Sequence, residues 1–417
     1  MVDLLIIGGG PAGLSAAIRA KEVGIKQILI VERSQILGGI LNQCIHNGFG
    51  LHVFKEELTG PEYAHRLICK VNDLNIPYEL NTIVTHLSKD KVAILQSRSG
   101  IKEVKAKAVI LAMGCRERPR GAINIPGSRP AGIYSAGCAQ ELVNMKGYKI
   151  GNRAVIVGSG DIGLIMARRL TLEGTEVMAV VEKMPYSSGL RRNIVQCLDD
   201  FQIPLHYEHT VSRIFGHERL TGVNIARVDE EGQVLAKTQT YLPCDTLLFS
   251  VGLIPENELS MGAFVKMSPL TGGAVVDSNL ESNVCGIFAC GNVLHVHDLV
   301  DNVTLEAYEA AVNVKHYLDE AQTKKQLLPV GFDKKIRYIV PHFINVTSTL
   351  GDTSFKFRVT QIYHHAVVAL YGDGEKMYQR KFRIITPGEL EMITVKQAIM
   401  EKLQDCKDIM IKIEVGD

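Results

Sequence analysis

Three glycines near the start of the chain have the spacing of a turn that binds a dinucleotide. Gly8, Gly10 and Gly13 follow the apolar run Asp3–Ile7, and a second apolar run ends on Glu32. In such a turn the first glycine allows the bend, the second lets the backbone approach a pyrophosphate, and the third lets a helix pack closely. The carboxylate of Glu32 would accept hydrogen bonds from the hydroxyls of an adenosine ribose. The pattern therefore predicts a site for the adenosine half of a dinucleotide.

The same pattern occurs a second time in the chain. Its glycines are Gly158, Gly160 and Gly163. The strand predicted after them ends on Glu182, and an acid at that place repels a 2′-phosphate. We therefore expect NAD(H) here, although Arg191 and Arg192 further along would suit the phosphate of NADP(H). Two such patterns predict two bound nucleotides.

Cys44 and His46 are the candidates for catalysis. They follow a Gly-Gly turn, and a thiol beside a histidine can become a nucleophilic thiolate. The alternative is a buried cysteine that packs as a small hydrophobic side chain. The sequence leaves both interpretations open.

These residues need a particular scaffold, and the apolar periodicity predicts it. Strands are expected over Gln27–Val31, Ala108–Ala112, Glu176–Val181, Thr246–Val251 and Gly286–Ala289, and helices over Ala12–Val23, Gly60–Leu74, Asp161–Leu172 and about Thr304–Ala321. From about Lys325 the pattern alternates as in β-strands, with one helix expected over about Thr394–Leu403. The predicted fold class is α/β, with two Rossmann-like domains and a small, mostly β C-terminal domain.

Composition excludes several classes of protein. The 417 residues have a net charge of +1, so no nucleic-acid surface is expected. No apolar run reaches the roughly 18 residues of a membrane span, and the chain starts in a core strand without a signal peptide. The nine cysteines form no Cys-x-x-Cys pair, which favours a reducing, cytoplasmic location without a zinc or iron–sulfur site.

Taken in order, these motifs resemble the pyridine-nucleotide–disulfide reductase superfamily. The two fingerprints, the strand end at Ala112–Gly114 and GIFACGN at 286–292 occur in the order of its thioredoxin-reductase-like members. The resemblance implies an FAD domain in two segments, 1–118 and 247–322, an inserted NAD(P) domain over 119–246, and a separate C-terminal domain over 325–417. The residues that the resemblance and the fingerprints assign to cofactor binding are Gly8, Gly10, Pro11, Ala12, Gly13, Glu32, Gly39, Val84, Ala112, Gly114, Gly158, Gly160, Asp161, Gly163, Glu182, Gly252, Gly291 and Asn292.

The stretches GCRERPRGA, GIYSAGCAQ and GNVLHVHDLVD carry a narrower resemblance. They are similar to flavoprotein subunits of multi-component dehydrogenases, of the opine-dehydrogenase, hydrogen-cyanide-synthase and sarcosine-oxidase types. They also resemble flavoproteins associated with bacterial glycerol-3-phosphate dehydrogenase gene clusters. This resemblance implies companion redox subunits. A homo-oligomer is also expected, because the β-rich tail has the character of an interaction or dimerisation module.

The chain departs from the superfamily at two places. A dithiol relay needs two sulfurs, but Cys44 stands alone after the Gly-Gly turn, and Ser135 precedes Cys138 where a redox pair would lie. Disulfide reduction is therefore not expected. The third motif ends in Asn292, where the family has an aspartate that holds a ribityl hydroxyl; an amide can also accept and donate there.

The sequence thus predicts an FAD-dependent oxidoreductase that exchanges electrons with NAD(H) or an organic substrate and passes them to a partner or acceptor. One alternative is a stand-alone NADH oxidase or peroxidase with Cys44 as a single redox thiol. The other is a non-catalytic assembly subunit that contains FAD. His295, His297 and Asp298 suggest a metal, but contacts with the flavin are the preferred interpretation. The C-terminal domain is expected to mediate assembly, or else to cover the flavin domain.

Overall fold

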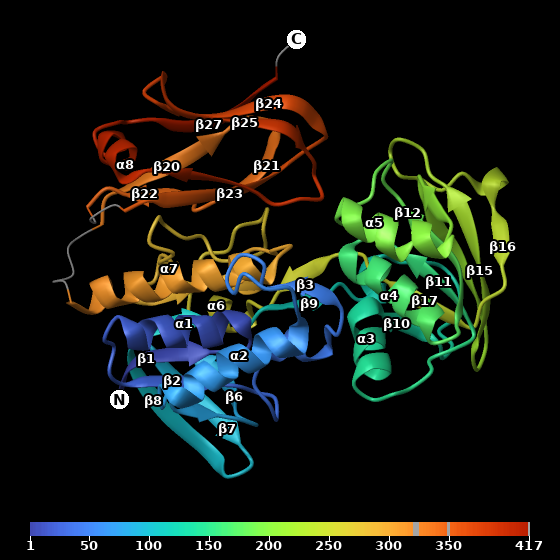
Figure 1. Ribbon diagram of the computed structural model, residues 1–417, viewed down its shortest axis with the longest axis horizontal. Coiled ribbons are helices and arrows are strands. Elements are labelled where there is room, and N and C mark those ends of the chain that lie inside the picture. The colour runs from blue at the N-terminus through green and yellow to red at the C-terminus, as the bar shows by residue number, and fades with distance from the viewer. Residues whose placement is uncertain (320–324, 348–350, 416–417) are drawn as a thin grey trace. The chain divides into compact units, whose positions relative to one another are not determined.

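The computed structural model describes residues 1–319, 325–347 and 351–415. It divides into two compact units, whose helices and strands are labelled in Figure 1. Unit 1 contains Met1–Cys115 and Pro255–Asp417, and unit 2 contains Arg116–Ile254. The chain crosses between them through β9 (Cys115–Glu117) and β18 (Leu253–Pro255). Unit 2 is thus an insertion within the sequence of unit 1.

The first part of unit 1 is built on one mixed sheet. Its parallel strands lie in the order β5 (Tyr78–Glu79), β2 (Ile28–Val31), β1 (Val2–Ile7), β8 (Gly100–Leu111) and β19 (Ile287–Ala289). The first half of β8 pairs antiparallel with β7 (Val92–Ser97), which pairs with β6 (Ile83–Leu87). The apolar run of β1 suits a central parallel strand, which is covered on both faces. Its carboxyl end therefore delivers the first glycine turn at an edge where such sheets place ligands.

Three helices lie beside this sheet. They are α1 (Pro11–Glu22), α2 (Gly60–Asp73) and α7 (Val300–Asp319), and α1 packs against both of the others. Figure 1 shows α7 as the long helix next to α1. Thr59 and Glu62 form a capping box that fixes the start of α2. Shorter elements of the unit are β3 (Asn47–Phe49), β4 (Leu58–Thr59) and α6 (Glu258–Gly262).

Unit 2 has a parallel five-stranded sheet of its own. The strand order is β10 (Ile133–Ser135), β17 (Thr246–Phe249), β11 (Arg153–Val157), β12 (Glu176–Glu182) and β13 (Leu205–Tyr207). The helices are α3 (Ala136–Asn144), α4 (Asp161–Leu172) and α5 (Arg191–Cys197). An antiparallel sheet of β14 (His209–Gly216), β15 (Leu220–Arg227) and β16 (Thr240–Leu242) completes the unit. The second glycine turn joins β11 to α4, as the first joins β1 to α1.

The C-terminal part of unit 1 consists of two β-sheets and one helix. One sheet has the order β22 (Phe343–Asn345), β20 (Leu327–Phe332), β27 (Ile409–Val415), β24 (Tyr363–Gly372) and β25 (Glu375–Ile385). The other has β21 (Ile336–Val340), β23 (Thr353–Val359) and β26 (Glu391–Val395), and the helix is α8 (Gln397–Leu403). Their facing apolar side chains form a separate core that includes Phe355, Phe357 and Ile411. We call residues 325–415 the C-terminal β domain.

Some predicted boundaries are wrong. The helix expected from Thr304 already begins at Val300, and its expected end near Ala321 lies outside the described residues. The helix expected from Thr394 begins at Gln397, because Thr394 and Val395 belong to β26 and pair with β23. Helical spacing alone could not show that pairing, which joins residues far apart in sequence.

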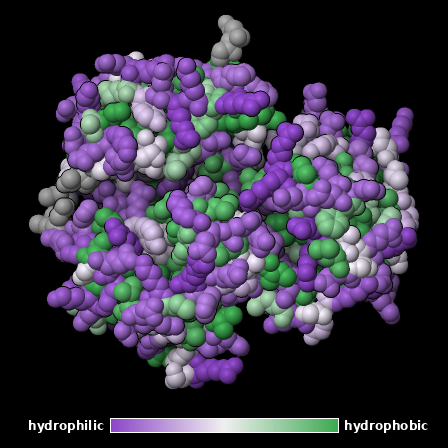
Figure 2. Space-filling model, in the orientation of Figure 1, coloured by the Kyte–Doolittle hydropathy of each residue, from purple (hydrophilic) through white to green (hydrophobic). Residues whose placement is uncertain are grey.

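The visible surface is mostly hydrophilic, and hydrophobic residues appear on it in small groups (Figure 2). Across residues 1–319, 325–347 and 351–415, no helix is both long and apolar enough to span a membrane.

Candidate functional site

The first glycine turn has the shape that the spacing predicts. Gly8 has a φ of +109°, and a Cβ there would lie 2.4 Å from the carbonyl oxygen of Ala112, at the end of β8. A Cβ on Gly13 would lie 1.8 Å from the carbonyl oxygen of Gly8. By contrast, a Cβ on Gly10 would meet nothing closer than 3.9 Å, at Gly39 Cα. The space beside Gly10 is therefore a cradle that fits a pyrophosphate, next to the amide groups at the start of α1.

Glu32 is fixed against this turn. Its side chain is buried, and Oε2 accepts a hydrogen bond of 2.6 Å from the backbone N–H of Gly9. Oε1 accepts one of 2.7 Å from the N–H of Ser34. Each carboxylate oxygen has a second lone pair, so both remain able to accept from ribose hydroxyls.

The second turn repeats this arrangement in unit 2. Gly158 has a φ of +90°, and a Cβ there would lie 2.1 Å from the carbonyl oxygen of Ser250. Glu182 Oε2 accepts from the N–H and the hydroxyl of Ser159, at 2.9 and 2.6 Å. Glu182 Oε1 accepts from the N–H of Met184 at 2.9 Å. The two turns thus each have a buried acid that is hydrogen-bonded to the glycine loop.

Other predicted residues of the second turn have contacts of their own. Gly160 is the N-cap of α4, and the N–H of Gly163 donates to the hydroxyl of Ser250 at 3.1 Å. Asp161 Oδ1 accepts from the N–H of Leu190 at 2.8 Å and from the side chain of Asn193 at 2.7 Å. Asp161 therefore fixes the loop before α5. Arg191 and Arg192 are exposed at the start of that helix.

The third motif lies over the first turn of α1. A Cβ on Gly291 would lie 2.9 Å from the Cβ of Ala12. Asn292 Oδ1 accepts from the N–H of His297 at 3.0 Å, and its Nδ2 donates to the sulfur of Cys115 at 3.6 Å. An aspartate could not donate to that sulfur, which gives asparagine a structural role here.

The remaining predicted cofactor contacts are placed as follows. Pro11 and Ala12 form the start of α1. Gly39 begins a short 3-10 helix facing Gly10, and Val84 lies in β6. Gly114 and Gly252 have φ angles of +71° and +101°, and a Cβ on either would meet open space.

The environment of Cys44 disfavours a thiolate. Burial raises the pKa of its thiol to about 12, and Sγ donates to the carbonyl oxygen of Ile40 at 3.3 Å. The ring of His46 packs against that of Phe49, with a centroid distance of 5.0 Å. A thiol with this pKa is almost entirely protonated at neutral pH.

Cys138 lies at the start of α3, after Ser135. Glu117 accepts from the backbone N–H groups of Gly137 and Cys138, at 2.7 and 3.3 Å. Burial raises the pKa of the Cys138 thiol, and the carboxylates of Glu117 and Glu141 raise it further. Glu117 therefore stabilises the helix start and disfavours a thiolate beside it.

A buried cluster of charged and polar side chains in unit 1 was not predicted. Glu306 on α7 contacts His295 Nε2 at 2.9 Å, His297 Nε2 at 3.0 Å and Lys356 Nζ at 2.9 Å. Asp298 is not part of it, because its carboxylate pairs with Arg358 and accepts from the N–H of Leu390. Of the suggested set, the structure brings His295 and His297 together, but Glu306 and not Asp298 is the carboxylate that meets them.

The sequence carries one signal related to this cluster, which is a regular alternation in β23. Phe355, Phe357 and Val359 are buried in the core of the C-terminal β domain. Lys356 and Arg358 alternate with them and so share the other face of the strand. Basic residues on such a face are usually exposed to solvent, but here Lys356 contacts Glu306 and Arg358 contacts Asp298 in the preceding part of unit 1.

Comparison with known proteins agrees with these observations. The family model for pyridine nucleotide-disulphide oxidoreductases matches residues 2–313. The chain is 27% identical over 326 residues to a thioredoxin reductase of Ureaplasma parvum serovar 3, covering 76% of this chain and 96% of the relative. It is 27% identical over 278 residues to hydrogen cyanide synthase subunit HcnB of Pseudomonas protegens, covering 61% of this chain and 57% of that one. The chain thus spans little more than half the length of the latter relative.

The fold is similar to that of a solved thioredoxin reductase from T. acidophilum. The TM-score is 0.63 at 23% identity, over 76% of this chain and 98% of that one. This likeness confirms the predicted α/β fold class with two Rossmann-type sheets. The matched family model shows that the chain belongs to the pyridine nucleotide-disulphide oxidoreductase family, whose members are FAD- and NAD(P)H-linked oxidoreductases.

Proposed function

We propose that this chain is an FAD-dependent oxidoreductase that exchanges electrons with NADH and acts as the flavoprotein subunit of a multi-component dehydrogenase. The observation that carries the proposal is the matching pair of glycine turns, each with a buried acid bound to it. Two equivalent sites of this kind suit two dinucleotides, one in each unit.

In this proposal FAD binds at the first turn. The open cradle at Gly10 takes the pyrophosphate, Glu32 accepts from the ribose, and the third motif at Gly291 and Asn292 lies beside the helix start. Bound FAD would supply hydride acceptance and onward electron transfer. The chain's own contribution is to orient the cofactor through these backbone groups and buried acids.

NADH binds at the second turn, at Gly158, Gly160 and Gly163. Glu182 accepts from the adenosine ribose and disfavours a 2′-phosphate. The acceptor is a companion protein, a role that fits the similarity to a named synthase subunit. The alternative with Cys44 as a redox thiol is weaker, because burial raises the pKa of that thiol to about 12.

The test is an anaerobic titration of the purified yellow protein with NADH, NADPH, glycerol 3-phosphate and amino acids, following loss of the flavin absorbance. We expect NADH to bleach the flavin. Gly160→Ala should keep the flavin but slow bleaching by NADH, because the added Cβ narrows the second turn. Colourless wild-type protein would contradict the FAD assignment. Bleaching by an organic substrate alone would contradict the role of NADH.

A further inference from the structure

Glu306 is the centre of the buried cluster in unit 1. Its side chain is fully buried and accepts hydrogen bonds from four groups. Oε2 accepts from the N–H of Gly291 at 2.7 Å and from His297 Nε2 at 3.0 Å. Oε1 accepts from His295 Nε2 and from Lys356 Nζ, both at 2.9 Å. Three of these groups belong to the loop that follows β19. The fourth comes from β23 of the C-terminal β domain.

Charge balance in the cluster depends on Lys356. Burial alone would raise the pKa of Glu306, but the Lys356 ammonium and the two imidazoles hold that pKa well below its usual value. Burial lowers the pKa of His295 to about 4, so this imidazole is neutral. Burial also raises the pKa of Glu309, whose carboxyl lies 3.6 Å from Lys356. Among the groups around Glu306, the Lys356 ammonium thus contributes most to keeping its carboxyl ionised.

A metal ion is the competing interpretation of the same side chains. His295, His297 and Glu306 have ligand atoms within 4.8 Å of one another, and such a set can bind a transition metal. However, the ammonium of Lys356 contacts the same Oε1 atom that His295 contacts. A divalent ion would have to sit beside that buried ammonium, which electrostatic repulsion opposes. The ammonium of Lys356, and not a metal ion, is therefore the better explanation of what balances the charge of Glu306.

The cluster holds the loop that carries the third motif. Glu306 accepts from the N–H of Gly291, and His297, which it also binds, donates its own N–H to Asn292. At the far end of the loop, Arg358 pairs with Asp298 and donates to the carbonyl oxygen of Val296. Arg358 thus holds the Asp298 end of segment 291–298 directly, whereas the Gly291 end is held by Glu306, the carboxylate that pairs with Lys356.

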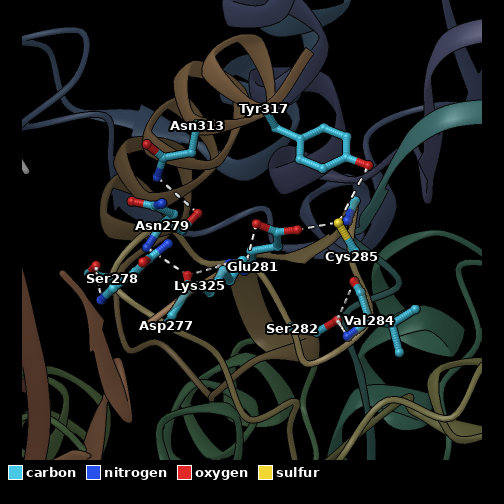
Figure 3. Close-up of polar contacts among 12 residues, drawn as sticks. Asp277, Ser278, Asn279, Glu281, Ser282, Val284, Cys285, Asn313, Tyr317 and Lys325 are labelled. Carbon is cyan, nitrogen blue, oxygen red and sulfur yellow. Dashed lines mark hydrogen bonds and ion pairs between the residues drawn. The ribbon is translucent and has the colours of Figure 1, made fainter. Parts of the chain in front are cut away.

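A second attachment lies at the start of the C-terminal β domain. Lys325 Nζ lies 2.7 Å from both Asp277 and Glu281. The three residues are drawn in Figure 3. The two carboxylates are almost fully buried. Nearby, the N–H of Asn345 donates to the hydroxyl of Ser278 at 3.1 Å. The domain is thus joined to the preceding fold through several specific polar contacts.

We propose that Lys356 is a positioning residue for FAD, through which the C-terminal β domain completes the flavin site by neutralising Glu306 and fixing the loop of Gly291 and Asn292. This inference rests on the proposed function, in which unit 1 binds FAD. It assigns the domain a part in cofactor binding, in addition to any role in assembly.

The test compares FAD affinity among variants of the full chain. Lys356→Met leaves Glu306 charged and buried without its cation, and we expect its FAD dissociation constant, measured by flavin fluorescence on the apoprotein, to rise ~10-fold or more. Lys356→Arg should restore part of the affinity. The double variant Lys356→Met with Glu306→Gln removes both charges and keeps an amide oxygen that can accept from Gly291, so it should bind FAD more tightly than Lys356→Met but less tightly than wild type. The control is Lys396→Met, an exposed lysine of the same domain that pairs with Asp352.

The outcomes separate the possibilities. Folded Lys356→Met protein with wild-type FAD affinity would overturn the inference, while FAD in the wild type would still support the proposed function. Wild-type protein that binds no FAD would overturn both. If Lys356→Met does not fold, the double variant decides: failure to bind FAD in a folded double variant would overturn the inference. One equivalent of divalent metal in the wild type, lost in His295→Asn, would also overturn it.

Discussion

The hydroxyl of Ser159 lies 2.6 Å from Oε2 of Glu182, and the backbone N–H of Ser159 donates to the same oxygen. Because the other oxygen accepts from Met184, the carboxylate is held on both sides. It has little freedom to turn away from a nucleotide at the second glycine turn. An acid fixed in this way should discriminate against a 2′-phosphate more sharply than one on a mobile loop.

We therefore expect NADH to reduce the flavin faster than NADPH. Glu182→Gln keeps a hydrogen-bond acceptor but removes the charge, so it should reduce the preference for NADH by about tenfold. Anaerobic stopped-flow absorbance measures both rates. Glu176→Gln, at the exposed start of the same strand, is the control and should leave the ratio unchanged. A wild-type preference for NADPH would instead assign Arg191 and Arg192 to the phosphate.

Gly10→Ala should abolish FAD binding without unfolding the protein. Gly10 has a φ of −78°, which alanine adopts readily, and its Cβ would meet no atom closer than 3.9 Å. The added methyl would occupy the cradle for the pyrophosphate. The flavin-to-protein ratio and the thermal midpoint of the apoprotein measure the two effects. Gly121→Ala is the control, since a Cβ there also meets open space. A full flavin complement in Gly10→Ala would place the cofactor elsewhere.

The thiol of Cys44 should react slowly. With a pKa of about 12, its thiolate fraction near pH 8 falls about a thousandfold below that of an ordinary cysteine. Timed alkylation with iodoacetamide, followed by peptide mass spectrometry, measures this rate. The same residue in guanidinium-unfolded protein is the reference. Equal rates in both states would contradict the raised pKa, and a faster rate in the folded protein would reveal an activated thiol and revive the peroxidase alternative.

Glu391 should make stability depend on pH. Burial, with a smaller effect of the Glu389 carboxylate, raises its pKa from 4.5 to about 7. A carboxyl whose pKa is raised by folding stabilises the protein fully below the unfolded value, and that stability is lost as pH rises through about 7. Glu391→Gln should thus match wild type near pH 4 and exceed it by about 3 kcal/mol near pH 8, in urea unfolding. Glu375→Gln, an exposed carboxylate on β25, should show no such divergence.

Local patterns in the sequence predicted the two glycine turns well. Gly8 and Gly158 need positive φ because each turn passes directly over the end of a neighbouring strand, and glycine spacing records that requirement. Glu32 and Glu182 were found because an acid at the end of the second strand is part of the same local pattern. The structure adds that both acids also hold the turns themselves.

The contacts of the C-terminal β domain could not be predicted in the same way. Lys356 meets Glu306 across 50 positions, and Arg358 meets Asp298 across 60. Such pairs depend on how a strand from one fold packs on a helix and loop of another. A single sequence shows that Lys356 and Arg358 share a face of β23, but it does not show what that face covers.

The separation of Glu306 from Lys356 also has a consequence for biosynthesis. Residues 116–254 leave the ribosome as a complete unit before α7 is made, so that unit can fold early. At about 5–20 residues per second, Lys356 follows Glu306 by about 3 to 10 s. During that interval α7 cannot bury Glu306 without leaving a charge unpaired. Unit 1, which begins at the N-terminus, would therefore finish folding after unit 2, which lies between its two segments in the sequence.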